Sequence, residues 1–119
     1  MNRRDAGALG ERIAAKHLAG LGYVILERNF RAKEGEIDIV AEKDDYLVFV
    51  EVRTKSSTEF GSPEESVTSA KKEKLIASSF AYLNSHRNPS PSWRIDFVAV
   101  ELDQKGKTTR IELIENAIS

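Results

Sequence analysis

The sequence predicts an α/β domain in which a mixed five-stranded sheet is flanked by helices, in the order α-β-β-β-α-β-β. Two segments with helical apolar stripes, residues 5–21 and 62–84, precede groups of short apolar strands. The second helix joins the third and fourth strands, which implies a right-handed parallel crossover. A chain of 119 residues with 40% hydrophobic and 31% charged residues is typical of a single folded domain, here residues 1–119.

Composition excludes several classes of protein. The chain has no cysteine, so disulfides and thiolate metal sites are absent, which suits a reducing compartment. Its first residues contain no continuous apolar run, and no segment approaches membrane-spanning length, so we expect a cytoplasmic protein without a membrane partner. The net charge of −1 means that any nucleic-acid binding must use local basic clusters.

The first helix is expected over residues 5–21, with Gly22 as its C-terminal cap. Gly7 and Gly10 reduce helix stability, so they should mark a close approach of the helix, most simply to the sheet. The residues of its apolar stripe are Leu9, Ile13, Leu18 and Leu21.

Strand patterns and a capping signal predict the remaining elements. The second helix should begin at the capping box formed by Ser62 and Glu65, with room for a break near Thr68. Its apolar face consists of Leu75, Ile76, Phe80 and Leu83. Strands are expected at residues 23–28, 36–42, 46–53, 93–102 and 110–114, and residues 29–35 should form a polar loop.

Residues 36–53 carry the chemistry, as an antiparallel hairpin with its loop centred between Asp44 and Asp45. A two-residue or a four-residue loop places Asp38 opposite Glu51, and it also pairs Glu36 with Arg53 and Val40 with Phe49. One face is apolar and must be buried, with residues Ile37, Ile39, Ala41, Val48, Val50 and Val52. The other face is charged, with Glu36, Asp38, Glu51, Arg53 and, one strand repeat further, Lys55.

Two carboxylates directly opposed in a sheet repel each other and need a compensating charge. Mg²⁺ or Mn²⁺ held by Asp38 and Glu51 is one explanation, because Mg²⁺ binds one or two carboxylates together with waters and substrate phosphate. Such an ion can activate water for attack on a phosphate. The alternative is an ordinary surface network in which Arg53, Lys55 or another basic residue neutralises the pair.

Other charged residues are weaker candidates. Glu11 lies beside Gly10, where close packing of the helix could bring its carboxylate to the hairpin; otherwise it is a solvated helix residue. Lys71 and Lys74 are three residues apart on the second helix. They form either a solvated helix face or a strip of phosphate contacts. Arg28, Arg31 and Lys33, which precede the hairpin, support the second reading.

A set of short motifs over nearly the whole chain resembles the uncharacterised bacterial YraN family. That family is in turn similar to the archaeal Holliday-junction resolvases, of the restriction-endonuclease-like superfamily. The motifs are Gly10-Glu11, Gly22-Tyr23, Asn29-Phe30-Arg31, Gly35-Glu-Ile-Asp38, Phe49-Val-Glu-Val-Arg53, Trp93-Arg-Ile-Asp-Phe-Val-Ala-Val and Ile111-Glu-Leu-Ile-Glu-Asn-Ala.

The resemblance implies a restriction-endonuclease-like core whose site combines a helix glutamate, an aspartate and a Glu-x-Lys strand. Glu11, Asp38 and Glu51 match the acidic positions, but the lysine position holds Arg53. Arginine keeps the charge and can hold a phosphate, yet it cannot act as a base at neutral pH. Lys55 lies on the same strand face, about 7 Å further along, and is the other candidate.

Three functions follow as hypotheses. The first is a Mg²⁺-dependent endonuclease for branched or structured DNA, with Glu11, Asp38, Glu51, Arg53 and Lys55 as catalytic residues. Arg31, Lys33, Lys71 and Lys74 would then contact nucleic acid, and a homodimer is implied by analogy with the resolvases. The second is a non-catalytic nucleic-acid-binding protein with the same fold. The third is a protein-interaction module whose acidic hairpin face docks a basic partner.

Overall fold

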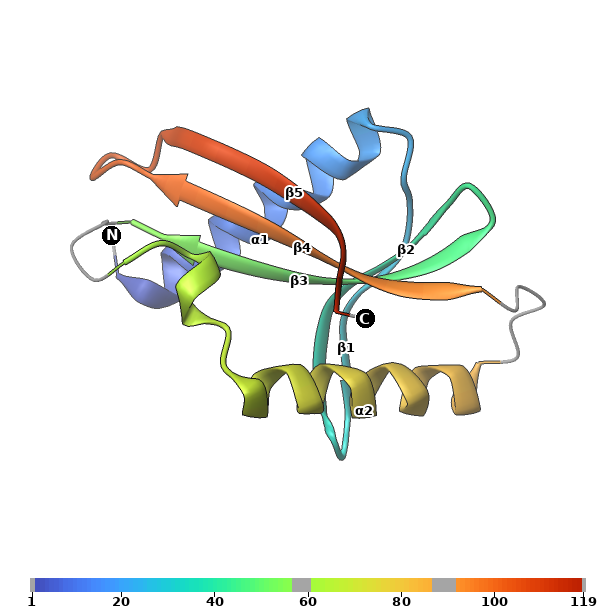
Figure 1. The fold of residues 1–119 in the computed structure, drawn as a ribbon. Coiled ribbons are helices and arrows are strands. Elements are labelled where there is room, and N and C mark those ends of the chain that lie inside the picture. Colours follow the sequence, from blue (N-terminus) through green and yellow to red (C-terminus); the bar gives the residue numbers. More distant parts are fainter. Residues whose placement is uncertain (1, 57–60, 87–91, 119) are drawn as a thin grey trace.

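The computed structural model describes residues 2–56, 61–86 and 92–118. Its five strands form one sheet in the order β1-β2-β3-β4-β5, in which only β3 and β4 run parallel (Figure 1). The predicted element order and mixed sheet are therefore confirmed. The elements are α1 (Arg3–Gly20), β1 (Val24–Ala32), β2 (Gly35–Lys43), β3 (Tyr46–Lys55), the 3-10 turn η1 (Glu64–Ser66), α2 (Ser69–Ser85), β4 (Trp93–Leu102) and β5 (Thr108–Ile118).

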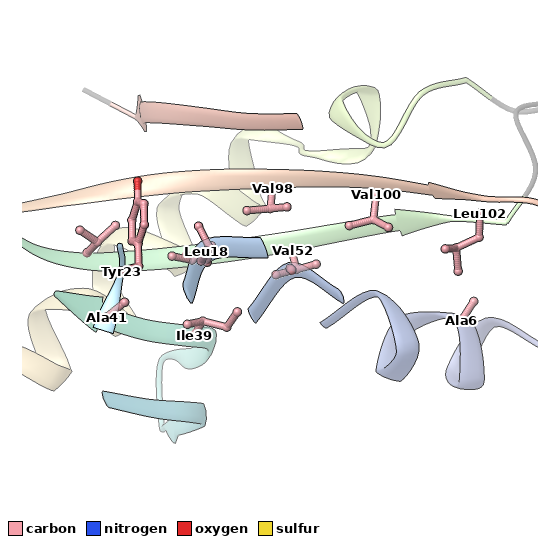
Figure 2. Packing of buried hydrophobic residues seen from close by; sticks show 12 residues of the cluster. Ala6, Leu18, Tyr23, Ile39, Ala41, Val52, Val98, Val100 and Leu102 are labelled. Carbon is pink, nitrogen blue, oxygen red and sulfur yellow. The ribbon is translucent and has the colours of Figure 1, made fainter. Parts of the chain in front are cut away.

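The two helices cover opposite faces of the sheet, and each face has its own apolar cluster. On the α1 side, Ala6 and Leu18 of the helix pack over Val52 of β3 and Val98 of β4 (Figure 2). On the α2 side, Leu75 and Tyr82 pack over Ile37, Val40, Phe49 and Ile95. Burial of these side chains supplies the main driving force for folding. None of the helices in the described ranges is both long and apolar enough to span a membrane.

The ends of α1 are fixed by two capping interactions. The side chain of Asn2 accepts a 2.8 Å hydrogen bond from the N–H of Asp5. At the other end, Gly22 adopts φ +94° and its N–H donates to the carbonyl of Ala19, while the N–H of Tyr23 donates to that of Leu18. This is a Schellman motif, which favours glycine in the left-handed position. The C-terminal cap predicted at Gly22 is therefore confirmed.

The close approach predicted for α1 occurs at Gly10. A Cβ atom at this position would lie 1.9 Å from Oγ1 of Thr54 on β3, so only glycine allows the helix to sit this close to the sheet. The same prediction is wrong for Gly7, where an added Cβ would meet nothing within 4 Å. Gly10 thus sets the distance between α1 and β3, on which the position of Glu11 depends.

The first hairpin is longer than the sequence predicts. Residues 29–35 were expected to form a loop. Instead β1 continues to Ala32, which pairs with Gly35 at the start of β2. Asn29 adopts φ 55° within the strand, a conformation that asparagine tolerates better than most residues. Because β1 is at the edge of the sheet, its end is polar and has a loop-like composition.

The β2–β3 hairpin confirms the predicted loop and part of the predicted register. Asp44 and Asp45 have φ values of 49° and 67°, as in a type I′ turn, and Val40 pairs with Phe49. The ladder ends at Ile39 and Val50, so the expected backbone pairs of Asp38 with Glu51 and of Glu36 with Arg53 do not form. Instead the N–H of Val52 donates to the carboxylate of Asp38.

The single apolar face predicted for this hairpin is wrong at Ile37. Ile39 packs on the α1 side, whereas Ile37 packs on the α2 side together with Val40 and Phe49. The alternation of β2 therefore changes near Asp38, where the strand leaves β3. Asp38 lies at this point of divergence.

The break predicted in the second helical segment separates η1 from α2. The hydroxyl of Ser62 accepts from the N–H of Glu65 at 3.4 Å and donates to the side chain of Glu65 at 3.3 Å, so only the first half of the expected capping box forms. Val67 is extended, and the hydroxyl of Thr68 caps α2 by accepting from the N–H of Lys71. The predicted apolar face is wrong at Phe80, which is 49% exposed.

Candidate functional site

The acid pair Asp38 and Glu51 forms the centre of the site. Oδ2 of Asp38 accepts a 2.8 Å hydrogen bond from the N–H of Val52, which holds the carboxylate against β3. Glu51 is only 3% exposed, and its carboxyl group hydrogen-bonds to that of Asp38. Burial first, and then hydrogen bonding and repulsion from Asp38, raise the pKa of Glu51 to about 9. The pair therefore keeps a proton at neutral pH.

Two cations partly offset the charge of this pair. Nζ of Lys71 lies 3.9 Å from Oε2 of Glu51, and Lys71 followed by Arg53 lowers the pKa of Glu51. The opposing effect of burial is larger. Oε2 is inaccessible to solvent and accepts no hydrogen bond from a donor group of the residues described. A buried carboxyl oxygen of this kind requires a proton or a cation close by.

Glu11 of α1 lies close enough to Asp38 for the two carboxylates to interact. Burial and the charge of Asp38 raise the pKa of Glu11, Arg28 lowers it, and Glu36 raises it further. The amide nitrogen of Asn29, in the orientation that satisfies its neighbours, donates to Glu11 at 2.9 Å and to Glu36 at 3.2 Å. Close packing at Gly10 thus brings the helix glutamate to the hairpin, as the sequence suggested.

The donor set suits a magnesium-type ion with an incomplete protein shell. Within residues 2–56, 61–86 and 92–118, no three His, Cys, Asp or Glu side chains are arranged to hold a metal together. Asp38 and Glu51 offer two carboxylates, and Glu11 stands too far apart to complete a set of three ligands. Mg²⁺ takes one or two carboxylates and completes its octahedral shell with water and substrate phosphate. The residues present therefore fit such an ion.

Arg53 is anchored by a residue that the sequence did not indicate. Its Nε donates to Oγ of Ser66 at 2.8 Å, and its Nη2 approaches the carbonyl oxygen of Ser66 at 3.5 Å. The hydroxyl of Ser66 in turn donates to the carbonyl of Pro63. Ser66 belongs to η1, far from the hairpin in sequence and without a spacing motif that would identify it. The guanidinium is thereby held on the side of the acid pair that faces η1.

Arg110 fixes η1 to the far edge of the sheet. Its guanidinium bonds to Glu64 of η1, to Glu101 of β4 at 2.7 Å and to Glu112 of β5. A chain of polar contacts therefore runs from β5 through η1 and Ser66 to Arg53. This arrangement determines where the arginine at the lysine position points.

An open cleft lies between α1 and β3, and one of its lining residues, Glu11, interacts with Asp38 of the acid pair. Its volume is about 550 Å³, and Lys55, Arg53 and Glu11 contribute to its walls. The other lining residues are Arg3, Ala6, Gly7, Val52, Thr54, Ser56 and Ser66. The cleft thus contains both cations expected near the acid pair, together with Arg3, which the sequence did not single out.

The predicted nucleic-acid contacts fall in two places. Lys71 approaches the acid pair, whereas Lys74 lies beside Gly35 at the end of the first hairpin, whose turn carries Lys33. Arg31 is exposed and lies 3.7 Å from Glu36. Lys71 and Lys74 therefore lie on α2, whereas Arg31 pairs with Glu36, which is near Glu11 of α1 on the other side of the sheet.

A second polar cluster at Asp96 is structural. This carboxylate is fully buried, and it accepts hydrogen bonds from the hydroxyl of Tyr23, from Nε of Arg94 and from the N–H of Asn116 at 2.8 to 3.0 Å. All of its charge is matched by donors, so no ligand is needed. The network joins the end of α1, β4 and the end of β5.

The fold and the site define an α/β protein in which a buried glutamate and a half-buried aspartate meet where the second and third strands of a mixed sheet diverge. Sequence comparison identifies the family. Residues 10–100 match the model of the uncharacterised protein family UPF0102, and the chain belongs to that family. The predicted likeness to an uncharacterised bacterial family is thereby confirmed.

Relatives match the chain over nearly its whole length. A UPF0102 protein of Dehalococcoides mccartyi is 50% identical over 117 residues, which cover 98% of this chain and 95% of that protein. A UPF0102 protein of Moorella thermoacetica is 47% identical, with 98% of both chains covered. The names of these relatives give no activity, so function has to be argued from the site.

Proposed function

We propose that this protein is a metal-dependent nuclease with a restriction-endonuclease-like core, acting on branched or otherwise structured DNA. The observation that carries the proposal is the position of the buried Glu51 carboxyl group beside the half-buried carboxylate of Asp38, which raises the pKa of Glu51. Placing a second carboxyl group beside a buried one is unfavourable, and such perturbed groups cluster at functional sites. Binding of Mg²⁺ or Mn²⁺ is the function that this donor set supports best.

Each residue around the pair would have its own role in hydrolysis. Asp38 and Glu51 would hold the ion, which supplies Lewis-acid activation of water when bound. Arg53 presents a guanidinium that neutralises charge on the scissile phosphate, and its bonds to Ser66 reduce its freedom to swing away. Lys55 adds a second cation one strand repeat along. Glu11, next to Asp38, is suited to orient water through its carboxylate.

Ion binding must displace the proton that Glu51 retains. Because the pKa of Glu51 is raised to about 9, binding at neutral pH releases this proton, and affinity for the ion should increase as the pH approaches that value. Lys71 favours the ionised form of Glu51, but it also repels the ion, and because exchange of one proton for a divalent ion adds positive charge to the site, its net effect opposes binding.

The decisive experiment is a Mn²⁺ soak of crystals, followed by cleavage assays on branched and linear DNA. We expect Mn²⁺ density between Asp38 and Glu51, and cleavage that is lost in Asp38→Asn. Glu34→Gln, in the exposed turn between β1 and β2, is the matched control. The proposal is wrong if the pair takes up no ion and Asp38→Asn cleaves as the wild type does.

A second candidate is a nucleic-acid-binding protein that retains the fold without cleaving. Arg53 favours this second candidate, because arginine cannot take a proton from water at neutral pH. Binding without cleavage, together with ion uptake at the carboxyl pair, would support this candidate. The protein-interaction hypothesis is less favoured, because Glu51 is buried and presents no acidic surface to a basic partner.

A homodimer in the cytoplasm is the setting we infer for this activity. Branched junctions have two-fold symmetry, and a dimer places one site on each symmetric strand. Sedimentation of the free protein and of its complex with a four-way junction tests the inference. A monomer in both would contradict it.

A further inference from the structure

We propose that the cleft between α1 and β3 binds a phosphate group of a nucleic-acid strand, next to the phosphate that meets Asp38 and Glu51. That the phosphate belongs to a nucleic-acid strand rests on the proposed function. Phosphate binding by the cleft can be measured without metal and without cleavage. Arg3, Arg53 and Lys55 are the residues that would hold this group.

The charge of the cleft supports an anionic ligand. Three cationic side chains line it against a single carboxylate, Glu11, in a protein whose net charge is −1. Among residues 2–56, 61–86 and 92–118, neither Arg3 nor Lys55 forms an ion pair. Repulsion between unpaired cations around one cleft is relieved by an anion bound between them.

Arg53 connects the cleft to the acid pair. Ser66 engages its Nε and Nη2, and Nη1 forms no hydrogen bond to the described part of the chain, so this nitrogen remains available to a ligand. Glu51, Arg53 and Lys55 follow one another at two-residue intervals along β3, about 7 Å apart. A nucleic-acid strand whose backbone runs along β3 would therefore meet the acid pair and then the cleft.

The shape of the cleft also favours a bulky ligand. Its volume of about 550 Å³ lies within the range of ligand sites in proteins. Gly7 lines the cleft, and an added Cβ would touch nothing within 4 Å, so glycine there is not required by packing of the helix. Glycine also weakens a helix by about 1 kcal/mol relative to alanine. Gly7 therefore leaves open space in the wall of the cleft, which a ligand can occupy.

The test measures binding of a short fluorescein-labelled single-stranded DNA in EDTA at low salt, by fluorescence anisotropy. Arg3→Ala should weaken binding several-fold and reduce the slope of log affinity against log salt by about 0.7, the value for one phosphate on a single strand. Arg4→Ala is the matched control, since Arg4 is the next residue of α1, is also exposed and does not line the cleft.

A second pair of variants tests the space in the cleft. Gly7→Gln should weaken binding several-fold and raise thermal stability, because it fills the cleft and improves the helix. Gly20→Gln is its control: Gly20 is also helical and has open space around it, but it lies outside the cleft. Loss of binding in a more stable protein cannot result from misfolding.

The source of the phosphate is distinguished by the probe. Stronger binding of a 5′-phosphorylated oligonucleotide than of its unphosphorylated form would show that the cleft holds a terminal phosphate, and equal binding that it holds an internal phosphodiester. The inference is overturned if the wild type does not bind at low salt, or if Arg3→Ala and Gly7→Gln bind as their controls do. Loss of binding in these variants without any metal-dependent cleavage would leave the cleft assigned and the nuclease proposal wrong.

Discussion

The backbone N–H of Val52 donates a 2.8 Å hydrogen bond to Oδ2 of Asp38, at the point where β2 leaves β3. A side-chain carboxylate thus takes the place of a strand carbonyl at the end of the ladder. This bond holds Asp38 beside Glu51 although the two residues are not paired through their backbones. It also gives Asp38 a structural role in addition to the proposed binding of an ion.

The Asp38–Glu51 pair should make stability fall with rising pH. The pKa of Glu51 is about 9 in the folded protein and 4.5 as a free side chain, so between these values the folded state holds a proton that the unfolded state has lost. Its contribution is therefore complete below about pH 4.5 and lost as the pH rises through about 9. Urea unfolding at several pH values should show this decline in the wild type.

Glu51→Gln should remove most of this pH dependence, because glutamine is neutral at every pH. Glu34→Gln, in the exposed turn of the first hairpin, should leave the decline unchanged. A wild-type protein as stable relative to Glu51→Gln at pH 9 as at pH 5 would contradict the protonated carboxyl pair.

Position 53 should control the rate of any cleavage. Arginine can neutralise a phosphate but cannot deprotonate water, so the natural protein should be a slow nuclease at neutral pH. Arg53→Lys should raise Mg²⁺-dependent cleavage of a branched DNA by about 10²-fold if it restores a general base. Cleavage rates under single-turnover conditions measure the effect.

Two further variants identify the working residue. Asp38→Ala in the Arg53→Lys background should abolish the gain, because the ion loses a ligand. If Arg53→Lys is inert while Lys55→Ala removes cleavage, Lys55 is the residue that acts on water. Arg53→Lys also loses the fork that binds Ser66, so its thermal stability should be measured alongside.

Lys71 and Lys74 should differ in their effect on metal binding. Exchange of the Glu51 proton for Mn²⁺ adds positive charge beside Lys71, so Lys71→Met should strengthen Mn²⁺ binding at neutral pH although it raises the pKa of Glu51. Lys74→Met should leave Mn²⁺ binding unchanged, yet each variant should lose about one phosphate contact to DNA, visible as a smaller salt slope. Calorimetric titrations with Mn²⁺ separate the two roles.

Lys16→Met, on the exposed side of α1, is the control for lost charge. It should affect neither Mn²⁺ binding nor the salt slope. Equal Mn²⁺ affinities for Lys71→Met and Lys74→Met would show that Lys71 does not act on the carboxyl pair.

Gly10→Ala should destabilise the fold by about 1–3 kcal/mol, as overpacked cores do. The added methyl group would lie 1.9 Å from Oγ1 of Thr54, which forces α1 away from β3. Thermal unfolding measures the loss, and Thr54→Ala should restore part of it by removing the two nearest atoms. Gly20→Ala, with open space around it, should be neutral or stabilising. An unchanged melting temperature for Gly10→Ala would disprove the tight contact.

Much of the fold could be predicted because local signals agreed with the tertiary structure. The apolar periods of the strands, the glycine cap at Gly22 and the Asp44-Asp45 turn each specify a local conformation, and the turn fixes the register up to Val40 and Phe49. The end of β1 could not be predicted, since an exposed edge strand has the composition of a loop. The change of face at Ile37 depends on α2, which packs on that side from a distant part of the sequence.

The site was predictable only where its residues share a hairpin. Asp38, Glu51 and Arg53 follow from strand periodicity, and Glu11 from its place beside a glycine that permits close packing. Ser66 and Arg3 reach the site from η1 and from the start of α1, and no spacing rule joins these segments to the hairpin. The burial of Glu51, and with it the retained proton, also depends on packing around the finished sheet.

The divergence of β2 from β3 has a consequence for the state of the protein in solution. In the ranges that the structure describes, β3 has no antiparallel neighbour on its β2 side beyond Val50. Asp38 occupies the N–H of Val52, but the residues after Val52 form an edge that is not paired with β2. Such edges invite pairing with strands of other molecules, and charged side chains, lysine above all, discourage it. We therefore expect Arg53 and Lys55 to discourage such pairing, and neutral substitutions at these positions to lower the solubility of the protein at high concentration.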